Sequence, residues 1–426
     1  MNHRQKHIDF LDHFRGIAVV AVFLFHSLGT ACGRNQLPWA NWIADFDVSR
    51  TFLVLLPFSL GWSGVAIFFV VSGFCIHLNF RRKPDWRDFT LRRFFRIYPP
   101  YLFAVLFFSL LIPWSRVGFD LLGVSQLWTH LALVHNFDNH SFFGISPAFW
   151  SIAVEAQIYL LYPILVALVA RFGWRRSLIY IGALEVGLRA LSNVVLVSTG
   201  ESPPLWFYGL PFIYWFSWSI GAAVADAYLS GRTLPFFNHS LLAWSAAAIG
   251  SAFLKPLASF SFLFFALLTA TAIAKLLGRG SRPVPFGRFF APLRRVGLWS
   301  YSIYLLHQPF LVLAPRVAGK LSFFGHPQIV VFVLCLCLWF PIMALSAIWY
   351  RIFEVPSIAF AKRFTTNAPN RATLQRTGAV VTPAAASPPS SHLDHAADDL
   401  VQEGGSCGNL RTESIATARS VRPMPE

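Results

Sequence analysis

Long apolar stretches alternate with short polar stretches along the chain up to about residue 350. A helix needs about 20 predominantly apolar residues to cross a bilayer, and windows near that length recur throughout this region. The pattern therefore predicts an all-α fold, a polytopic transmembrane helical bundle of about ten transmembrane helices. The predicted windows are 15–32, 59–79, 98–114, 147–170, 176–198, 205–229, 239–255, 257–278, 297–316 and 328–350.

Lys and Arg fall mainly into the loops on one side of this predicted bundle. Basic clusters occur at 81–96, 171–176 and 279–295, whereas the loops on the other side hold few cations. Cytoplasmic loops carry the excess of Lys and Arg in membrane proteins, so both termini are predicted to be cytoplasmic. The net charge of +16 is then explained by these cytoplasmic loops, and no nucleic-acid partner is expected. We expect a multi-pass protein of a cell membrane, such as the bacterial inner membrane.

Composition agrees with this prediction, because 55% of the residues are hydrophobic and only 13% are charged, which excludes an ordinary soluble domain. The five cysteines lack metal-ligand spacing, so neither a disulfide framework nor a zinc site is expected. The first apolar run lacks a convincing cleavage site and is expected to remain as a helix. The transmembrane domain is predicted over 1–363. Residues 364–426, rich in Ala, Pro, Ser and Thr, are predicted to form a disordered cytoplasmic tail.

Two polar residues, Arg15 and His26, bound the apolar part of the first window. Eleven positions make about three helical turns, so both side chains fall on one helix face, roughly 16 Å apart along the axis. Placing two such polar side chains against lipid is costly, so this helix face is expected to point toward protein or a water-filled cavity. Ionisable residues in that position usually have a functional role, which makes His26 a candidate functional residue. The structural alternative is a histidine that only forms a hydrogen bond with a neighbouring helix.

Three further polar residues are predicted near the bilayer midplane, at the depth of His26. Glu155 lies roughly 12 Å along the fourth window and His307 roughly 15 Å along the ninth, and Ser72 of the second window falls at a similar depth. Together they could serve acid–base chemistry or a proton relay. The structural alternatives are a helix-bridging Glu155, a His307 that marks a helix break before a proline, and a Ser72 that permits close packing.

A separate ionisable pair lies in the fifth window. Glu185 and Arg189 are spaced i to i+4, which places opposite charges on one helix face. We expect them to neutralise each other inside the membrane and to be structural.

A basic segment, RRKPDWRDFTLRRFFRIYPPY, leads into the third window. Its Arg92, Arg93 and Arg96 are predicted to lie in a cytoplasmic loop, far from the midplane, where membrane anchoring alone would place such residues. Guanidinium groups also bind phosphate bidentately, as the nucleotide of coenzyme A would require. These arginines are therefore candidates for binding a nucleotide-bearing donor.

Taken together, these segments resemble the acyltransferase 3 family of integral membrane acyltransferases, which includes O-antigen and Nod-factor acetylases. The resemblance covers about residues 7–355 and rests on five motifs in the family's order. The chain has Ala66 where many members have Asp, and His13 where Gly is common. The motifs are LDHFRGIAVVAVFLFH, GWSGVAIFFVVSGFCI, LRRFFRIYPPY, FWSIAVEAQIYLLYP and YSIYLLHQP.

The resemblance implies transfer of an acyl group, most often acetyl, from cytoplasmic acyl-CoA to a hydroxyl of a carbohydrate or glycolipid across or within the membrane. His26 would then remove the sugar hydroxyl proton or protonate the departing thiolate. Glu155 would orient or stabilise the resulting imidazolium. Ser72 and His307 are possible supporting residues.

The donor side of this hypothesis rests on arginines. Arg15, nearer the cytoplasm than His26, would hold the phosphates of acyl-CoA together with Arg92, Arg93 and Arg96. The resemblance implies that acyl-CoA, most often acetyl-CoA, is the donor substrate, and no permanently bound cofactor and no metal are expected. The predicted partners are acyl-CoA, a carbohydrate or glycolipid acceptor, and membrane lipid.

The alternative function is a proton-coupled secondary transporter or flippase that uses Glu155, His26 and His307 as a relay. Such transporters usually contain repeated halves with broken helices in matching positions. No internal repeat is found in this sequence.

Overall fold

The computed structural model describes residues 8–32, 56–118, 120–279, 290–319 and 327–366, and these residues form helices and connections without a strand. The predicted all-α fold is confirmed for this part of the chain. From Phe10 onward the described residues belong to one compact unit, Phe10–Gly378. Its helices are α1 (Phe10–Cys32), η3 (Leu56–Ser63), α3 (Gly64–Arg82), α4 (Trp86–Leu106), η4 (Phe107–Leu111), α5 (Leu121–Leu131), η5 (His135–Phe137), α6 (Trp150–Thr199), α7 (Leu205–Tyr208), η6 (Pro211–Ile213), α8 (Trp215–Leu229), α9 (Leu241–Phe253), η7 (Lys255–Phe260), α10 (Ser261–Gly278), α11 (Ala291–Leu298), α12 (Ser300–Leu311), α13 (Leu313–Ala318), α14 (Pro327–Trp349), η9 (Tyr350–Glu354) and α15 (Val355–Thr366).

Six helices within the described residues are long and apolar enough to cross a membrane. They cover seven of the predicted windows, because the 50-residue α6 spans two of them and changes direction at Gly173, whose φ of 74° and ψ of 167° are not helical. The windows 205–229, 239–255 and 297–316 instead hold shorter helices. A multi-pass membrane protein is thus supported, while the count of about ten spans stays a prediction. The six are Phe10–Cys32, Pro57–Arg82, Trp86–Leu111, Trp150–Thr199, Pro256–Gly278 and Gln328–Phe364.

The third predicted window begins too late. Asp85 caps the N-terminus of α4 by accepting hydrogen bonds from the backbone N–H groups of Arg87 (2.9 Å) and Asp88 (3.2 Å). The helix therefore starts at Trp86, although its first turns are too polar to register as a membrane window. The prediction that Arg92, Arg93 and Arg96 lie in a loop is wrong, because all three are helical residues of α4. At the other end of the unit, α15 continues to Thr366, and the remainder of the predicted tail lies outside the described residues.

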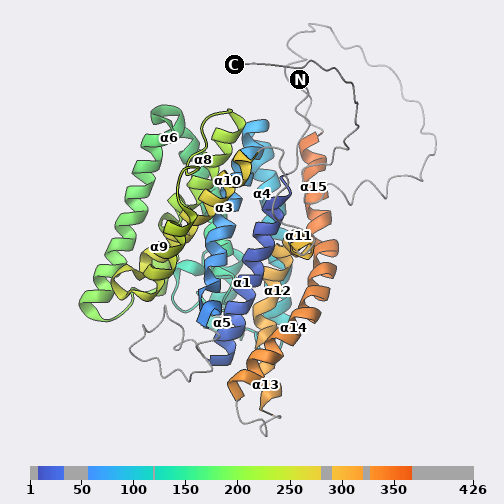
Figure 1. The fold of residues 1–426 in the computed structure, drawn as a ribbon. Helices are drawn as coiled ribbons and strands as arrows, with labels where there is room; N and C mark the ends of the chain where they lie inside the picture. Colours follow the sequence, from blue (N-terminus) through green and yellow to red (C-terminus); the bar gives the residue numbers. More distant parts are fainter. Residues whose placement is uncertain (1–7, 33–55, 119, 280–289, 320–326, 367–426) are drawn as a thin grey trace, which may run out of the picture. The chain divides into compact units, whose positions relative to one another are not determined.

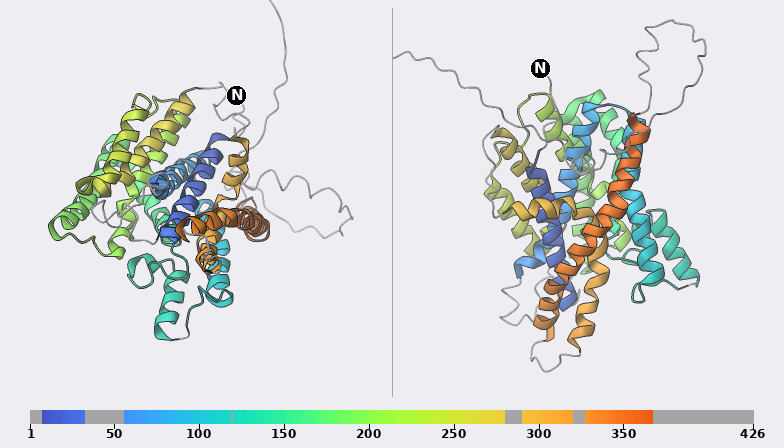
Figure 2. Two further views of the ribbon diagram at one scale, coloured as in Figure 1. Left: turned by 60° about the horizontal axis from the view of Figure 1, so that its bottom comes forward. Right: turned by 90° about the vertical axis from the view of Figure 1, so that its right-hand side faces the viewer.

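Helix α3 packs against α1, α8 and α10, while α6 and α9 lie on one side of this group and α14 and α15 on the other (Figures 1 and 2). Two glycines permit the close approach of α3 and α8. A Cβ atom on Gly73 would lie 2.1 Å from the carbonyl oxygen of Trp218, and one on Gly221 would lie 2.0 Å from that of Val70. The small-residue packing expected beside Ser72 is therefore present at Gly73.

The ion pair in the second half of α6 is fully enclosed. Arg189 Nε lies 3.1 Å from Glu185 Oε1, and Arg189 also donates hydrogen bonds of 2.6 Å to the carbonyl oxygens of Ser259 and Ile213. Glu185 accepts hydrogen bonds from the backbone N–H (3.0 Å) and hydroxyl (2.6 Å) of Ser217 at the start of α8. Because these contacts satisfy both charged groups, the pair fits the structural interpretation.

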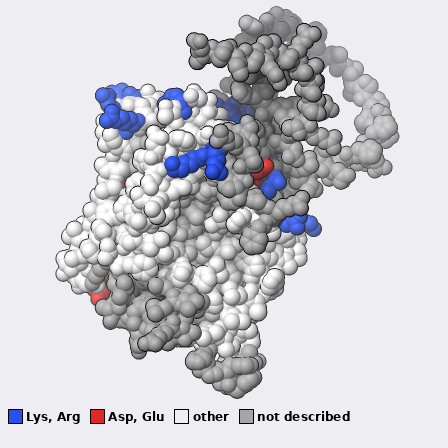
Figure 3. All heavy atoms as spheres, viewed as in Figure 1, with Lys and Arg blue, Asp and Glu red and all other residues white. Residues whose placement is uncertain are grey.

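Basic side chains gather toward one end of the unit. On the face seen in Figure 3, Lys and Arg lie over the upper part of the described surface. This distribution agrees with the grouping of basic clusters on one side of the membrane. Which side faces the cytoplasm stays a prediction.

Candidate active site

His26 and His307 meet in the interior of the bundle, one from α1 and the other from α12. The distance between His26 Nδ1 and His307 Nε2 is 2.8 Å, and the ring centroids are 5.0 Å apart. His307 is fully buried. The two histidines placed at one depth by the sequence are therefore hydrogen-bonded to each other.

The backbone around His307 determines which nitrogen atoms carry protons. His307 Nδ1 lies 3.1 Å from the carbonyl oxygen of Ile303 and 3.0 Å from that of Tyr304. Carbonyl oxygens only accept hydrogen bonds, so Nδ1 of His307 is the protonated nitrogen and its Nε2 is an acceptor. His26 then donates from Nδ1, and a neutral His26 keeps its lone pair on Nε2. The network thus assigns the tautomer that can act as a base.

Glu155 belongs to an adjacent group of polar side chains from α3, α6 and α8. The hydroxyl of Tyr159 donates a hydrogen bond of 2.6 Å to Glu155 Oε1 and lies 3.2 Å from the hydroxyl of Ser72. Trp218 Nε1 in turn donates to Ser72 Oγ at 3.3 Å. Since a phenol has one proton, Ser72 donates to Tyr159, and the chain of donors runs from Trp218 to Glu155.

The His26 ring is thus hydrogen-bonded to His307, whereas Glu155 is hydrogen-bonded to Tyr159. The expectation that Glu155 orients or stabilises the His26 imidazolium stays a prediction, and His307 is the residue whose hydrogen bond fixes the orientation of the His26 ring. Sequence reasoning also missed Tyr159, although it lies one helical turn after Glu155 in the motif FWSIAVEAQIYLLYP, where an i to i+4 contact is expected.

A cavity of about 120 Å³ opens beside Glu155 and brings the predicted arginines close to it. Arg15, Arg93 and Arg96 line this cavity together with Ser72, Tyr159 and Tyr304, among other residues. The Tyr304 ring also lies 5.6 Å from the His307 ring, measured between centroids, and its hydroxyl is 2.6 Å from that of Ser151. Tyr304 thus stands between the cavity and the histidine pair.

The three candidate arginines, all on α4, differ in their partners. Arg92 pairs with Asp88 at 3.0 Å, one turn earlier on the helix. Arg96 pairs at 3.0 Å with Glu354, which is fully buried in η9 and also accepts a hydrogen bond from a serine hydroxyl. No carboxylate of the described residues lies within ion-pair distance of Arg93, which lines the cavity with Glu155. The expectation that all three lie far from the candidate centre is wrong for Arg93 and Arg96.

Arg15 is held on α1 by two contacts. Its Nη1 donates to Asp12 Oδ1 at 2.9 Å, and its Nη2 donates to the sulfur of Cys75 at 3.3 Å. Asp12 is almost completely buried, while 27% of the Arg15 side chain remains exposed. Arg15 is therefore positioned beside the Glu155 cavity and still accessible to a ligand.

The site combines His26, whose Nε2 carries a lone pair that can accept a proton, with an adjacent cavity that is lined by a carboxylate and guanidinium groups. Such a site can transfer protons at one end and bind an anionic group at the other. No group of three or more His, Cys, Asp or Glu side chains in the described part of the chain is arranged to hold a metal ion.

Residues 8–347 match a family model described as an acyltransferase domain, the acyltransferase 3 model. The chain belongs to this acyltransferase family. The match includes both histidines and the arginine and glutamate residues of the candidate site. No solved structure shows a significant match.

Three curated proteins illustrate the similarity. Peptidoglycan O-acetyltransferase OatA of Listeria monocytogenes is 26% identical over 74% of this chain and 51% of its own length. Acyltransferase MdmB of Streptomyces mycarofaciens is 28% identical over 72% of this chain and 80% of its own length. Nodulation protein 10 of Rhizobium leguminosarum is 25% identical over 76% of this chain and 87% of its own length. The chain spans only about half the length of the peptidoglycan O-acetyltransferases that it matches.

Proposed function

We propose that the chain is a membrane-embedded O-acyltransferase that moves an acyl group from acyl-CoA to a hydroxyl of a carbohydrate or glycolipid. Family membership and the names of the relatives support this reaction class. The observation that carries the chemistry is the 2.8 Å contact between His26 and His307, because it leaves the basic lone pair of His26 on Nε2.

In this reaction the acceptor hydroxyl gives its proton to His26 Nε2 while its oxygen attacks the thioester carbonyl. The carbon–sulfur bond then breaks, and the imidazolium returns the proton to the departing thiolate. The products are an ester and a free thiol, and His26 is neutral again. His307 accepts a hydrogen bond from His26 Nδ1–H throughout, and this bond strengthens when His26 becomes positively charged. His307 is thus a positioning residue that acts through His26.

The cavity beside Glu155 supports a role for Arg93 and Arg15 on the donor side. Arg93 is the α4 arginine that lines the cavity without a carboxylate partner among the described residues, so its guanidinium is available for an anionic group of the donor. Arg92 and Arg96 are instead paired with Asp88 and Glu354. The donor role therefore falls mainly on Arg93, with Arg15 beside it.

The size of this cavity favours a short acyl group. Pockets for whole drug-sized ligands measure about 300 Å³ or more, and the Glu155 cavity measures about 120 Å³. It suits an acetyl thioester at the end of a pantetheine arm, with the nucleotide outside. Because Arg15 precedes His26 on α1 by about three turns, the donor approaches from the Arg15 end and the acceptor from the other. In the proposed orientation, the Arg15 end of the site lies on the cytoplasmic side of a bacterial inner membrane.

Two assays with the full chain test this function. Surface carbohydrate from a deletion strain that expresses either the wild type or His26→Ala is analysed for ester-linked acyl groups by mass spectrometry. Purified protein is incubated with acetyl-CoA and the same carbohydrate, and free thiol is measured. We expect ester formation and thiol release from the wild type and neither from His26→Ala. As a control, His135→Ala replaces a fully buried histidine outside the candidate site and should retain activity.

The proposal fails if a well-expressed His26→Ala variant transfers acyl groups normally. It also fails if the wild type changes the surface carbohydrate without consuming any thioester. The latter result would favour the transporter alternative, because proton-coupled transport of a substrate releases no thiol.

A further inference from the structure

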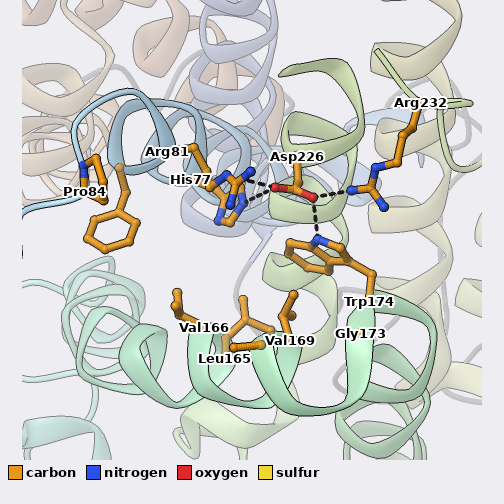
Figure 4. A pocket seen from close by; sticks show the side chains of 12 residues that line it. His77, Arg81, Pro84, Leu165, Val166, Val169, Gly173, Trp174, Asp226 and Arg232 are labelled. Atoms are coloured by element: carbon orange, nitrogen blue, oxygen red, sulfur yellow. Dashed lines mark hydrogen bonds and ion pairs between the residues drawn. The ribbon is translucent and has the colours of Figure 1, made fainter. Parts of the chain in front are cut away.

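A second and larger cavity, of about 500 Å³, lies between α3, α6 and α8. It shares α3 and α6 with the Glu155 cavity but none of the residues that line it. Figure 4 shows a cluster of polar side chains on one side of this cavity and a row of apolar side chains on the other. The proposed acyl transfer makes no use of this cavity.

The polar side centres on Asp226 of α8. His77 Nε2 donates to this carboxylate at 3.2 Å, and Trp174 Nε1 donates at 2.7 Å. Arg81 lies 3.1 Å from the same carboxylate, and Arg232 also forms an ion pair with it. Two guanidinium groups thus face one carboxylate, so the ionisable groups that line the cavity leave at least one positive charge uncompensated.

The positive charge is accessible. The Arg81 side chain is 51% exposed and the Arg232 side chain is 54% exposed, although Asp226 between them is almost buried. Arg81 lies at the end of α3, in the basic cluster at 81–96, and Arg232 lies just after α8. The predicted orientation places both on the cytoplasmic side. At that depth a bound anion would lie among the lipid headgroups of the inner leaflet.

The opposite side of the cavity is apolar and follows the first half of α6. Figure 4 shows Leu165, Val166 and Val169 pointing from this helix toward the Asp226 cluster. The helix turns away at Gly173, where no atom lies within 4 Å of the position that a Cβ would occupy. Phe80, Pro84 and Ala170 complete this apolar lining. A ligand that fills the whole cavity therefore needs an apolar body and an anionic head.

We propose that this cavity binds an anionic phospholipid of the inner leaflet, with the phosphate between Arg81 and Arg232 and an acyl chain along the apolar face of α6. A phosphodiester carries one negative charge, which matches the uncompensated charge of the cluster. The nucleotide of coenzyme A carries several negative charges and little apolar surface, so the apolar wall suits it less well. The bound lipid would join α3, α8 and the bend of α6, and would stabilise their packing.

Native mass spectrometry of the purified full chain in neutral detergent tests this site. The protein is titrated with phosphatidylglycerol, with phosphatidylcholine of the same acyl chains, and with inorganic phosphate. We expect phosphatidylglycerol to be retained in preference to phosphatidylcholine, and inorganic phosphate not to displace it. Arg232→Ala should weaken phosphatidylglycerol binding roughly tenfold through loss of a charge-assisted contact. The control Arg176→Ala removes an exposed cation that does not line the cavity and should bind like the wild type.

A second variant tests the apolar part of the site independently of its charges. Val169→Trp fills the space beside α6 and leaves Asp226, Arg81 and Arg232 unchanged, so it should lose phosphatidylglycerol binding while its lipid-free melting temperature stays near that of the wild type. Equal retention of both lipids would overturn the proposal, as would wild-type affinity in both Arg232→Ala and Val169→Trp. Full displacement by inorganic phosphate would identify a simple anion site and would also overturn the lipid assignment.

Discussion

Replacing His307 tests whether it acts through His26. The 2.8 Å contact is a neutral hydrogen bond in the resting pair and becomes charge-assisted when His26 takes up a proton. A charge-assisted hydrogen bond contributes about 1.5–3 kcal/mol, so its loss in the transition state should lower kcat roughly ten- to a hundredfold. We therefore expect His307→Ala to lose activity in kcat, with little change in the KM for acyl-CoA.

The assay is thiol release from acetyl-CoA by purified protein in the presence of the acceptor carbohydrate. His307→Gln should recover part of the lost kcat, because its side-chain oxygen can accept from His26 Nδ1–H. The double variant His26→Ala/His307→Ala should be no slower than His26→Ala alone, since a positioning residue has nothing left to position. If His307 has a purely structural role, the kcat losses of the two single variants should multiply in the double variant, and the amount of folded protein should fall.

The reasoning is refuted if His307→Ala keeps wild-type kcat. It is also refuted if the losses of the two single variants multiply in the double variant. His135→Ala, a buried histidine outside the site, distinguishes general effects of removing an interior imidazole from the specific effect at His26.

Four further predictions concern other parts of the molecule. Arg93→Ala should raise the KM for acyl-CoA roughly tenfold or more, with partial rescue by Lys, whereas Arg92→Ala should change it little, as measured by thiol-release kinetics. Gly221→Ala should lower the apparent melting temperature, with a destabilisation of about 1–3 kcal/mol, because its Cβ would lie 2.0 Å from a carbonyl oxygen of α3. Burial lowers the pKa of His130 from 6.5 to about 4. As the pH falls, His130 is therefore protonated at a higher pH in the unfolded chain than in the folded chain, so the stability of the fold should decrease between about pH 6.5 and pH 4. His130→Phe should reduce this pH dependence in thermal scans. Finally, a cysteine introduced at Asn139 should react with an impermeant label added outside intact cells.

Each of these has a contrary outcome. Equal KM values for the two arginine variants would remove the donor role of Arg93. Gly187→Ala, at a site with no atom within 4 Å of the added Cβ, is the packing control, and equal melting temperatures for both glycine variants would contradict the close-approach explanation. An unchanged pH dependence in the His130 variant would exclude that histidine as the cause. An unlabelled Asn139 position in a protein that is labelled after the membrane is opened would reverse the proposed orientation.

The sequence alone determined the features that depend on local pattern. Apolar windows predicted a helical membrane protein, and the spacing of Arg15 and His26 placed both on one face of α1, because helical periodicity depends only on residue number. Motifs in a characteristic order identified the family, which the family match confirms. Similar depths for His26 and His307 also followed from counting residues along two helices.

Only the tertiary structure decided which side chains meet. His26 is hydrogen-bonded to His307, and Glu155 is hydrogen-bonded to Tyr159. Arg93 lines the Glu155 cavity, while Arg92 pairs within its own helix. Depth along a helix axis does not specify which way each helix is turned about that axis. That rotation is set by packing between distant segments, such as the close contact of α3 with α8. The start of α4 was not predicted, because the helix begins after an N-cap, with polar first turns that precede its apolar part.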